Sequence, residues 1–145
     1  MTRDRLSKVS MNEMNRKRRI LIIDDDEEFL SDLTILLADY FQVDVACGTQ
    51  EAMEKMRQQL PDCLLLDVEM PRYFGDDSDI EGFSFLQKLY GQILRDGAVK
   101  IPLVLVSSHE GRIPHSADQV FNIRARFAKP PDITKLRRTI CELTS

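Results

Sequence analysis

Three short runs of uninterrupted apolar residues constrain the fold of this chain more than any other feature. They occupy residues 20–23, 63–66 and 103–106, and amphipathic stretches with helical spacing lie between them. A strand that helices cover on both faces needs apolar side chains on both sides, so such runs are typical of the inner strands of a parallel sheet. Their alternation with helical stretches indicates βα units.

Two further strand-like segments carry polar residues, which suits the two edges of a sheet. Residues 43–45 place an aspartate between two valines, and residues 124–128 include two arginines. Five strands with these edges predict a doubly wound parallel α/β sheet of order 2-1-3-4-5 with helices on both faces. In that order the switch point, where such sheets bind their ligands, lies between the first and third strands.

The apolar spacing also predicts which helix faces point inward. A first helix would use Phe29, Leu33, Leu36, Leu37 and Tyr40. A second would start at Thr49 as its N-cap and bury Ala52, Met53 and Met56. A last helix would use Ile133, Leu136, Ile140 and Leu143. Further helices are expected near residues 86–93 and, weakened by Pro114, near residues 113–121.

Composition points to one domain without a membrane span. The chain has 145 residues, of which 43% are apolar, and no run approaches the roughly 20 apolar residues that a membrane helix needs. Cys47, Cys63 and Cys141 are odd in number, so we expect reduced, mostly buried thiols in a cytoplasmic protein.

Charge divides the chain into a basic start and an acidic body. Residues 1–19 carry seven Lys or Arg against two acids, a formal charge of +5, and the remainder carries −9. We expect residues 1–18 to be a flexible basic leader and residues 19–145 to form the domain. An acidic body argues against nucleic acid as a direct partner.

Each inner strand and the last strand end in residues that can carry chemistry. Asp24-Asp25-Asp26 follow the first run, Asp67 the second, Ser107-Ser108 the third, and Lys129-Pro130 the last strand. Carboxyl ends of parallel strands meet at one edge of the sheet, so these side chains should converge. Clustered carboxylates repel one another unless a cation binds, and Mg²⁺ prefers a few carboxylates, water and a phosphate. A lysine and a hydroxyl beside them suit phosphoryl oxygens.

These residues resemble the receiver domain of two-component response regulators, a flavodoxin-like fold, over Arg19 to about Leu143. The resemblance implies that Asp67 accepts a phosphoryl group from a histidine kinase or histidine phosphotransfer protein. It further implies that Asp24, Asp25, Asp67 and the backbone carbonyl of Glu69 bind Mg²⁺ or Mn²⁺. Ser107 and Lys129 would contact the phosphoryl oxygens, and the Lys129–Pro130 bond would be cis.

The chain also departs from the receiver pattern. Residues 72–81 form an acidic stretch about seven residues longer than usual, interpreted as a solvated insertion or, alternatively, as a gate beside the site. Arg126 stands where the family often has an aromatic switch residue, and Glu69 and His109 occupy positions that tune phosphoryl lifetime.

These observations predict a stand-alone signalling switch rather than an enzyme, with slow self-catalysed dephosphorylation. Its output would come through contacts with a downstream protein, and a phosphorylation-dependent dimer is a further expectation. A fragment of a larger regulator is an alternative. Two other functions stay open, namely a receiver-like binding module that is not phosphorylated, and a haloacid-dehalogenase-type phosphatase with Asp24 as nucleophile and Asp26 as general acid.

Overall fold

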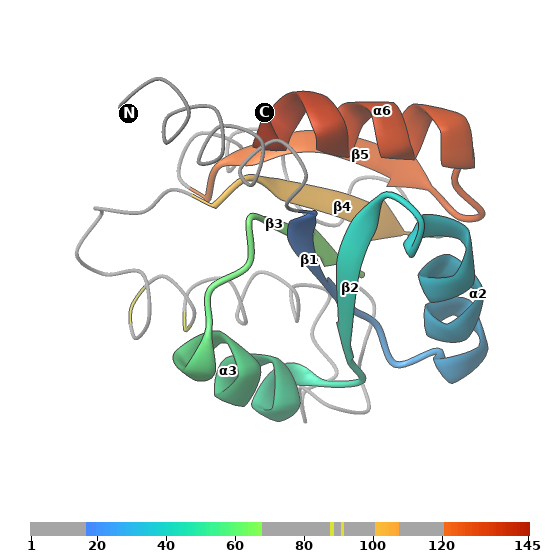
Figure 1. The fold of residues 1–145 in the computed structure, drawn as a ribbon. Coiled ribbons are helices and arrows are strands. Elements are labelled where there is room, and N and C mark those ends of the chain that lie inside the picture. Colours follow the sequence, from blue (N-terminus) through green and yellow to red (C-terminus); the bar gives the residue numbers. More distant parts are fainter. Residues whose placement is uncertain (1–16, 68–87, 89–90, 92–100, 108–120) are drawn as a thin grey trace, which may run out of the picture.

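A computed structural model describes residues 17–67, 88, 91, 101–107 and 121–145. Five parallel strands form one sheet of order β2-β1-β3-β4-β5, as predicted (Figure 1). The strands are β1 (Arg18–Ile23), β2 (Phe41–Ala46), β3 (Cys63–Leu66), β4 (Leu103–Ser107) and β5 (Ile123–Ala128). The helices with described bounds are α2 (Glu27–Leu37), α3 (Thr49–Gln58) and α6 (Ile133–Thr144).

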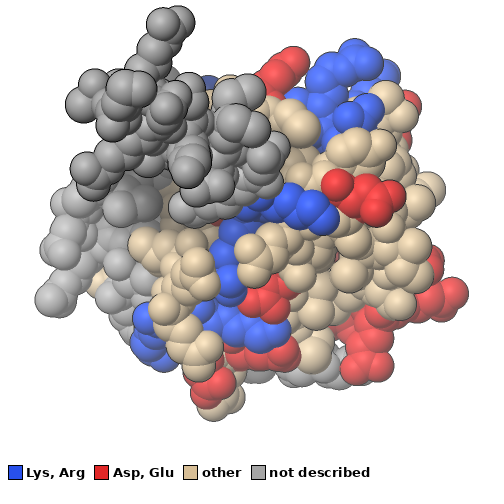
Figure 2. Space-filling model, viewed as in Figure 1, with Lys and Arg blue, Asp and Glu red and all other residues tan. Residues whose placement is uncertain are grey.

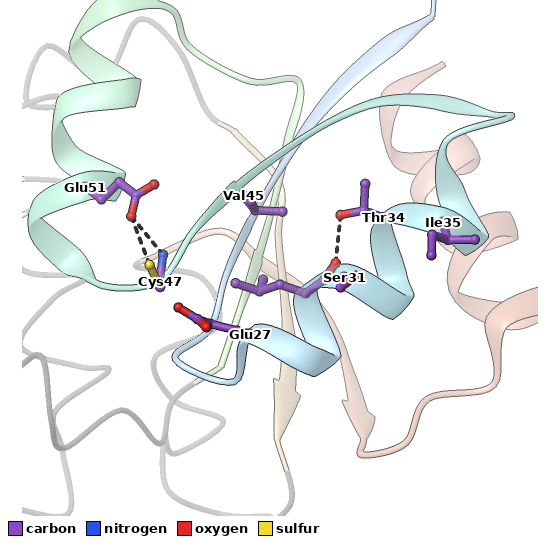
Figure 3. A pocket seen from close by; sticks show the side chains of 8 residues that line it. Glu27, Ser31, Thr34, Ile35, Val45, Cys47 and Glu51 are labelled. Carbon is purple, nitrogen blue, oxygen red and sulfur yellow. Dashed lines mark hydrogen bonds between the residues drawn. The ribbon is translucent and has the colours of Figure 1, made fainter.

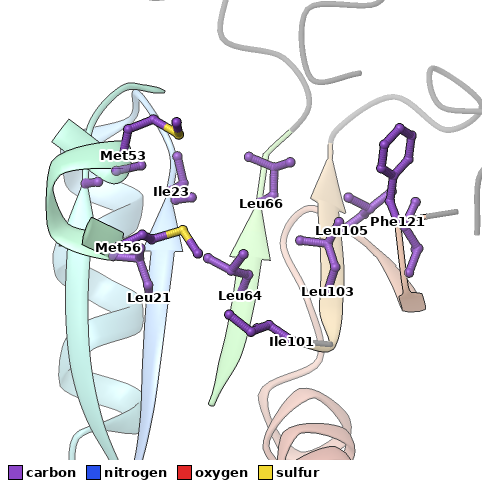
Figure 4. Close-up of a cluster of buried hydrophobic side chains, with 13 residues drawn as sticks. Leu21, Ile23, Met53, Met56, Leu64, Leu66, Ile101, Leu103, Leu105 and Phe121 are labelled. Atoms are coloured by element: carbon purple, nitrogen blue, oxygen red, sulfur yellow. The ribbon is translucent and has the colours of Figure 1, made fainter. Parts of the chain in front are cut away.

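The three inner strands are buried on both faces, which explains their continuous apolar runs. Successive side chains of a strand point to opposite faces. One face packs against α3 and forms a cluster that includes Leu21, Leu64, Leu103 and Met56 (Figure 4). The other face packs against α2 and α6, so helices cover both faces of the sheet.

The edge strands have the mixed polarity that the sequence predicted. Asp44 in β2 is half-buried and pairs with Arg19 at 2.9 Å and with Lys55 at 2.9 Å, which neutralises charge along that edge. In β5, Leu103 pairs with Ile123 and Val104 with Ala125, so Arg124 is an extra residue and is exposed. Such a bulge distorts the ladder at an outer strand, where it costs least.

The predicted last helix is confirmed, with Leu136 and Ile140 buried. The prediction for the first helix is partly wrong. Leu30, Leu33 and Leu37 form its buried positions, whereas Leu36 and Tyr40 are 49% and 50% exposed. The helix ends at Leu37, so Tyr40 lies beyond it and no longer follows the helical period.

The second helix buries Ala52, Met53 and Met56 as predicted, but its N-cap was misplaced. Gly48 is the N-cap and Thr49 is the first helical residue. No described side chain caps this end of the helix; Glu51 in the first turn instead accepts the backbone N–H of Cys47, just before the cap, at 3.2 Å. All three cysteines are free, and of them Cys63 is buried, Cys47 half-buried and Cys141 exposed.

Several predictions fall outside the described residues. They concern most of the leader, the carbonyl of Glu69, the 72–81 stretch, His109 and most of the two helices expected near residues 86–93 and 113–121. Among the described residues, none forms a helix of the length and apolarity that a bilayer crossing requires. The Lys129–Pro130 bond is cis, as predicted.

Candidate functional site

Two aspartates lie side by side because the strands before them are hydrogen-bonded neighbours. Asp24 follows β1 and Asp67 follows β3, and the last residues of these strands, Ile23 and Leu66, are paired in the sheet. The Asp67 N–H donates to the Ile23 carbonyl at 2.9 Å, and the Asp24 N–H donates to the Ala46 carbonyl at 3.1 Å. The sheet therefore holds both backbones at its carboxyl edge, where the sequence predicted the site.

Asp24, Asp25 and Asp67 form an acidic cluster. One carboxylate oxygen from each lies within 4.8 Å of the other two. Asp24 is 1% exposed and Asp67 is 4% exposed, whereas Asp25 is half-buried. Burying carboxylates away from water is costly unless a cation or hydrogen-bond donors compensate. The cluster thus has the character of a binding site rather than of a solvated helix start.

Lys129 reaches this cluster from the end of β5. Its ammonium nitrogen lies 2.6 Å from Asp24 Oδ2 and 3.2 Å from Asp67 Oδ2. Burial alone would lower the pKa of the Lys129 ammonium, but hydrogen bonding to Asp24 and the charge of Asp67 outweigh it. The net effect raises that pKa above its usual value. The lysine is therefore a permanent positive charge at neutral pH.

Ser107 is the last residue of β4 and is 8% exposed. Its carbonyl accepts the Lys129 N–H at 3.0 Å, and the neighbouring Ala128 pairs with it in the sheet. This backbone bond ties the end of β4 to the lysine that enters the acidic cluster. The structure therefore brings together the main chains of all four predicted strand ends.

The acidic cluster suits a hard divalent cation. Its donors are carboxylate oxygens, which Mg²⁺ and Mn²⁺ both accept, and no described histidine or cysteine belongs to it. Three carboxylates and one ammonium have a combined formal charge of −2, which a divalent cation neutralises. Magnesium usually takes one or two carboxylates and keeps several waters, so two or three such groups are a sufficient protein contribution.

Asp26 plays a different part from its two neighbours. It is exposed, and its Oδ1 accepts the backbone N–H of Phe29 at 3.0 Å as the N-cap of α2. Its own N–H donates to Asp24 Oδ1 at 2.9 Å. The run of three aspartates therefore divides into two cluster carboxylates and one helix cap. Acidic side chains gather over the start of α2, where Glu27 and Glu28 follow (Figure 2).

Sequence reasoning missed one aromatic residue at the site. The Lys129 ammonium lies over the ring of Phe29, 4.3 Å from its centroid. Phe29 was predicted only as part of the inward face of the first helix. No local pattern relates it to a lysine one hundred positions later, so only the folded structure reveals the contact.

A pocket of about 360 Å³ lies beside the site, between α2 and the end of β2 (Figure 3). It is lined mainly by apolar groups, with Glu27 and Glu51 at its border. The Cys47 thiol donates to Glu51 at 3.1 Å, and this hydrogen bond raises the pKa of Cys47 and lowers the pKa of Glu51. Because the raised pKa of Cys47 keeps its thiol protonated and weakly nucleophilic, the acidic cluster is the stronger candidate site.

Comparisons with known proteins agree with this geometry. The sequence matches the response regulator receiver domain over residues 20–140. It is 34% identical over 98 residues to a protein-glutamate methylesterase/protein-glutamine glutaminase of Rhizobium johnstonii, covering 66% of this chain and 23% of that protein. A protein of the same description from Rhodopseudomonas palustris is 31% identical over 109 residues, covering 73% and 26%. The chain spans about a quarter of the length of these curated relatives.

Solved structures share the fold. A receiver domain protein described as CheY-like, from Methanospirillum hungatei, superposes with a TM-score of 0.68 at 24% identity, covering 87% of this chain and 92% of that one. The chemotaxis response regulator CheY4 of Vibrio cholerae also gives a TM-score of 0.68, at 19% identity, covering 88% and 98%. With the family match over most of the sequence, these findings show that the chain belongs to the response regulator receiver domain family.

Proposed function

We propose that Asp67 accepts a phosphoryl group from the phosphohistidine of a histidine kinase or histidine phosphotransfer protein. The observation that carries this proposal is the contact between the Lys129 ammonium and both Asp24 and Asp67 in a buried acidic cluster at the carboxyl edge of the sheet. A carboxylate held beside a fixed positive charge can attack phosphorus while that charge stabilises the equatorial oxygens.

The transfer is balanced without any redox partner. An oxygen of the Asp67 carboxylate forms a bond to phosphorus, and the P–N bond of the donor phosphohistidine breaks. The electron pair of that bond leaves with the imidazole, and an acyl phosphate remains on Asp67. Lys129 is already within 3.2 Å of an Asp67 oxygen, so its ammonium needs little movement to meet the new phosphoryl oxygens. We assign the Ser107 hydroxyl the role of a second donor to them.

We assign metal binding to Asp24, Asp25 and Asp67, with the backbone carbonyl of Glu69 as a further ligand outside the described residues. A bound Mg²⁺ or Mn²⁺ would neutralise charge on the donor phosphate and on the carboxylates. The chain's own contribution is to hold these oxygens at one strand edge and to keep them partly shielded from water.

We infer a signalling role, in which the phosphorylated domain contacts a downstream protein and loses its phosphate slowly by hydrolysis. The methylesterase and glutaminase activities in the names of the relatives belong to those longer proteins, of which this chain matches about a quarter. The acidic cluster itself combines three carboxylates and a lysine, a set of groups that suits a cation and a phosphoryl group.

The test is phosphorylation by a small acyl-phosphate donor. The protein is incubated with acetyl phosphate and Mg²⁺, and the gain of one phosphoryl group is followed by intact mass and mapped by peptide sequencing after borohydride trapping. We expect one adduct at Asp67 that is labile in both acid and base, as an acyl phosphate is, and that the substitution Asp67→Asn abolishes. Asp26→Asn is the matched control, because asparagine keeps the N-cap and leaves the acidic cluster unchanged.

The same experiment separates the alternatives. A phosphatase of the haloacid-dehalogenase type would label Asp24 and would lose turnover in Asp26→Asn. The structure offers no support for it, since the Asp26 carboxylate is exposed and engaged in capping α2. A binding module that is not phosphorylated would show no adduct at all, and that outcome would contradict our proposal.

A further inference from the structure

The Lys129 ammonium has three described partners, and each comes from a different part of the fold. Asp24 follows β1, Asp67 follows β3, and the ring of Phe29 lies in the first turn of α2. The two carboxylates attract the ammonium toward the acidic cluster. The aromatic ring lies 4.3 Å from the same nitrogen and covers it from the helix side.

Phe29 is itself held in place. Its backbone N–H donates to Asp26 Oδ1 at 3.0 Å, and the Asp26 N–H donates to Asp24 Oδ1 at 2.9 Å. The side chain is half-buried and packs against the apolar cluster beneath α2. Phe29, Asp24 and Asp67 also line the same narrow gap in the packing, which is too small to hold a water molecule. The backbone of Phe29 is therefore linked through Asp26 to Asp24, while its ring rests on the apolar cluster.

A lysine needs such a constraint because its four-carbon stem is flexible and its ammonium is strongly hydrated. The two carboxylates do not hold it equally, since Asp24 is 2.6 Å away and Asp67 is 3.2 Å away. Without a barrier, water could solvate the ammonium and the lysine could pair with Asp24 alone. The negative face of an aromatic ring attracts a cation and also excludes water from that side.

We propose that Phe29 is a positioning residue that holds Lys129 toward Asp67 through an ammonium–aromatic contact. This inference rests on the proposed phosphoryl transfer for its functional consequence, but the contact itself does not. Removing the ring while keeping an apolar side chain should leave the fold intact and slow phosphorylation. Restoring an aromatic ring should restore the rate.

The kinetic test compares Phe29→Leu with Phe29→Tyr. The rate of Asp67 phosphorylation is measured against acetyl phosphate concentration at saturating Mg²⁺. We expect Phe29→Leu to lower the rate roughly two- to thirtyfold, as the loss of one cation–aromatic contact would, and Phe29→Tyr to recover most of it. In a Lys129→Met background, Phe29→Leu should have no further effect, because the group on which the ring acts is gone.

The chain offers a matched control. The Arg137 guanidinium lies over the ring of Tyr40, 4.4 Å from its centroid, so Tyr40→Leu removes an equivalent contact outside the acidic cluster. It should leave the phosphorylation rate unchanged. A rate loss in Tyr40→Leu as large as that in Phe29→Leu would show a general effect on the fold and would overturn the inference.

A second measurement works without phosphorylation. In the unphosphorylated protein, the ring current of Phe29 should shift the NMR signals of the Lys129 ε-methylene protons upfield of those of the other lysines. Phe29→Leu should abolish that shift and Tyr40→Leu should retain it. If wild type shows no Asp67 adduct, the proposed function fails while the NMR comparison still decides this inference. An unshifted Lys129 signal in wild type, or a wild-type rate in Phe29→Leu, would overturn it.

Discussion

Lys129 connects the ends of three other strands of the sheet. It links carboxylates that follow β1 and β3 with the backbone of Ser107 in β4. Its pKa is raised because the favourable interactions with Asp24 and Asp67 exceed the cost of burial. A raised lysine pKa keeps the ammonium charged throughout the physiological range, so it acts as a fixed charge and not as a proton donor at neutral pH.

Replacing this charge should therefore impair transfer. Lys129→Met keeps a long, flexible apolar side chain but removes the ammonium, and we expect the rate of Asp67 phosphorylation to fall by about 10²-fold, as when one preorganised charge-stabilising group is removed. Stopped-flow or quench measurements with acetyl phosphate and Mg²⁺ give the rate. Lys135→Met, at an exposed position in α6, is the control. Equal rates in wild type and Lys129→Met would contradict the assignment.

Cys63 and Cys141 should differ sharply in reactivity. Burial raises the pKa of Cys63 to about 12, so almost no thiolate is present at neutral pH, and the side chain is also inaccessible. Cys141 is exposed on α6. With a thiol-specific chromogenic reagent, Cys141 should react within the native protein and Cys63 only after unfolding. Cys141→Ser should remove the fast phase, and a fast phase that persists in that variant would contradict the prediction.

At the scale of elements, the strands could be predicted better than the helices. A strand covered on both faces must be apolar at every position, so residues 20–23, 63–66 and 103–106 were recognisable from composition alone. An amphipathic helix is recognised by the regular spacing of its apolar residues. That spacing no longer tells which side chains are buried where the helix ends. Tyr40 was placed inward because the pattern does not reveal that α2 ends at Leu37, and Leu36 because the consecutive apolar residues 35–37 leave the inward face ambiguous.

The N-cap residues of the helices were also difficult to predict from the sequence. Thr49 has the right side chain for an N-cap, but the chain already enters the helix there, and Gly48 occupies the cap position. Asp26 and Asp132 do act as N-caps, accepting backbone N–H groups from Phe29 at 3.0 Å and from Lys135 at 3.1 Å. Two candidate caps one residue apart differ little in sequence, so the choice between them depends on where the preceding strand ends.

Loss of the α6 cap should destabilise the protein without altering its chemistry. Asp132→Ala leaves the Lys135 N–H without its side-chain acceptor, and we expect a loss of about 1 kcal/mol in the free energy of unfolding. Urea denaturation followed by circular dichroism measures it. Asp132→Asn should cost much less, because asparagine also accepts this hydrogen bond. Equal losses in both variants would mean that charge, and not capping, is responsible.

At the scale of the whole molecule, the position of the site could be predicted and its detailed geometry could not. Parallel strands bring their carboxyl ends to one edge, so topology alone predicted that Asp24 and Asp67 would meet. The contact of Lys129 with Phe29, and the unequal distances from Lys129 to the two carboxylates, depend on packing between distant segments. No periodicity in the sequence encodes such contacts.

Metal binding should stabilise the whole fold, because the acidic cluster exists only when β1 and β3 are paired. With free Mg²⁺ about tenfold above its Kd, we expect a gain of about 1.4 kcal/mol in the free energy of unfolding. Thermal denaturation with and without Mg²⁺ measures the gain, and Asp25→Asn should reduce it. Asp39→Asn, an exposed change outside the cluster, should leave it intact. Undiminished stabilisation in Asp25→Asn would place the ion elsewhere.

The order of the strands along the chain has a consequence for synthesis. The paired aspartates belong to the first half of the molecule, but the lysine that neutralises part of their charge follows the last strand of the sheet. A growing polypeptide on the ribosome therefore has its acidic pocket before it has the counterion. If Asp67 is the phosphoryl acceptor, competence to receive a signal arrives only after this last strand has been translated, so products truncated before it should not take up phosphate from the donor.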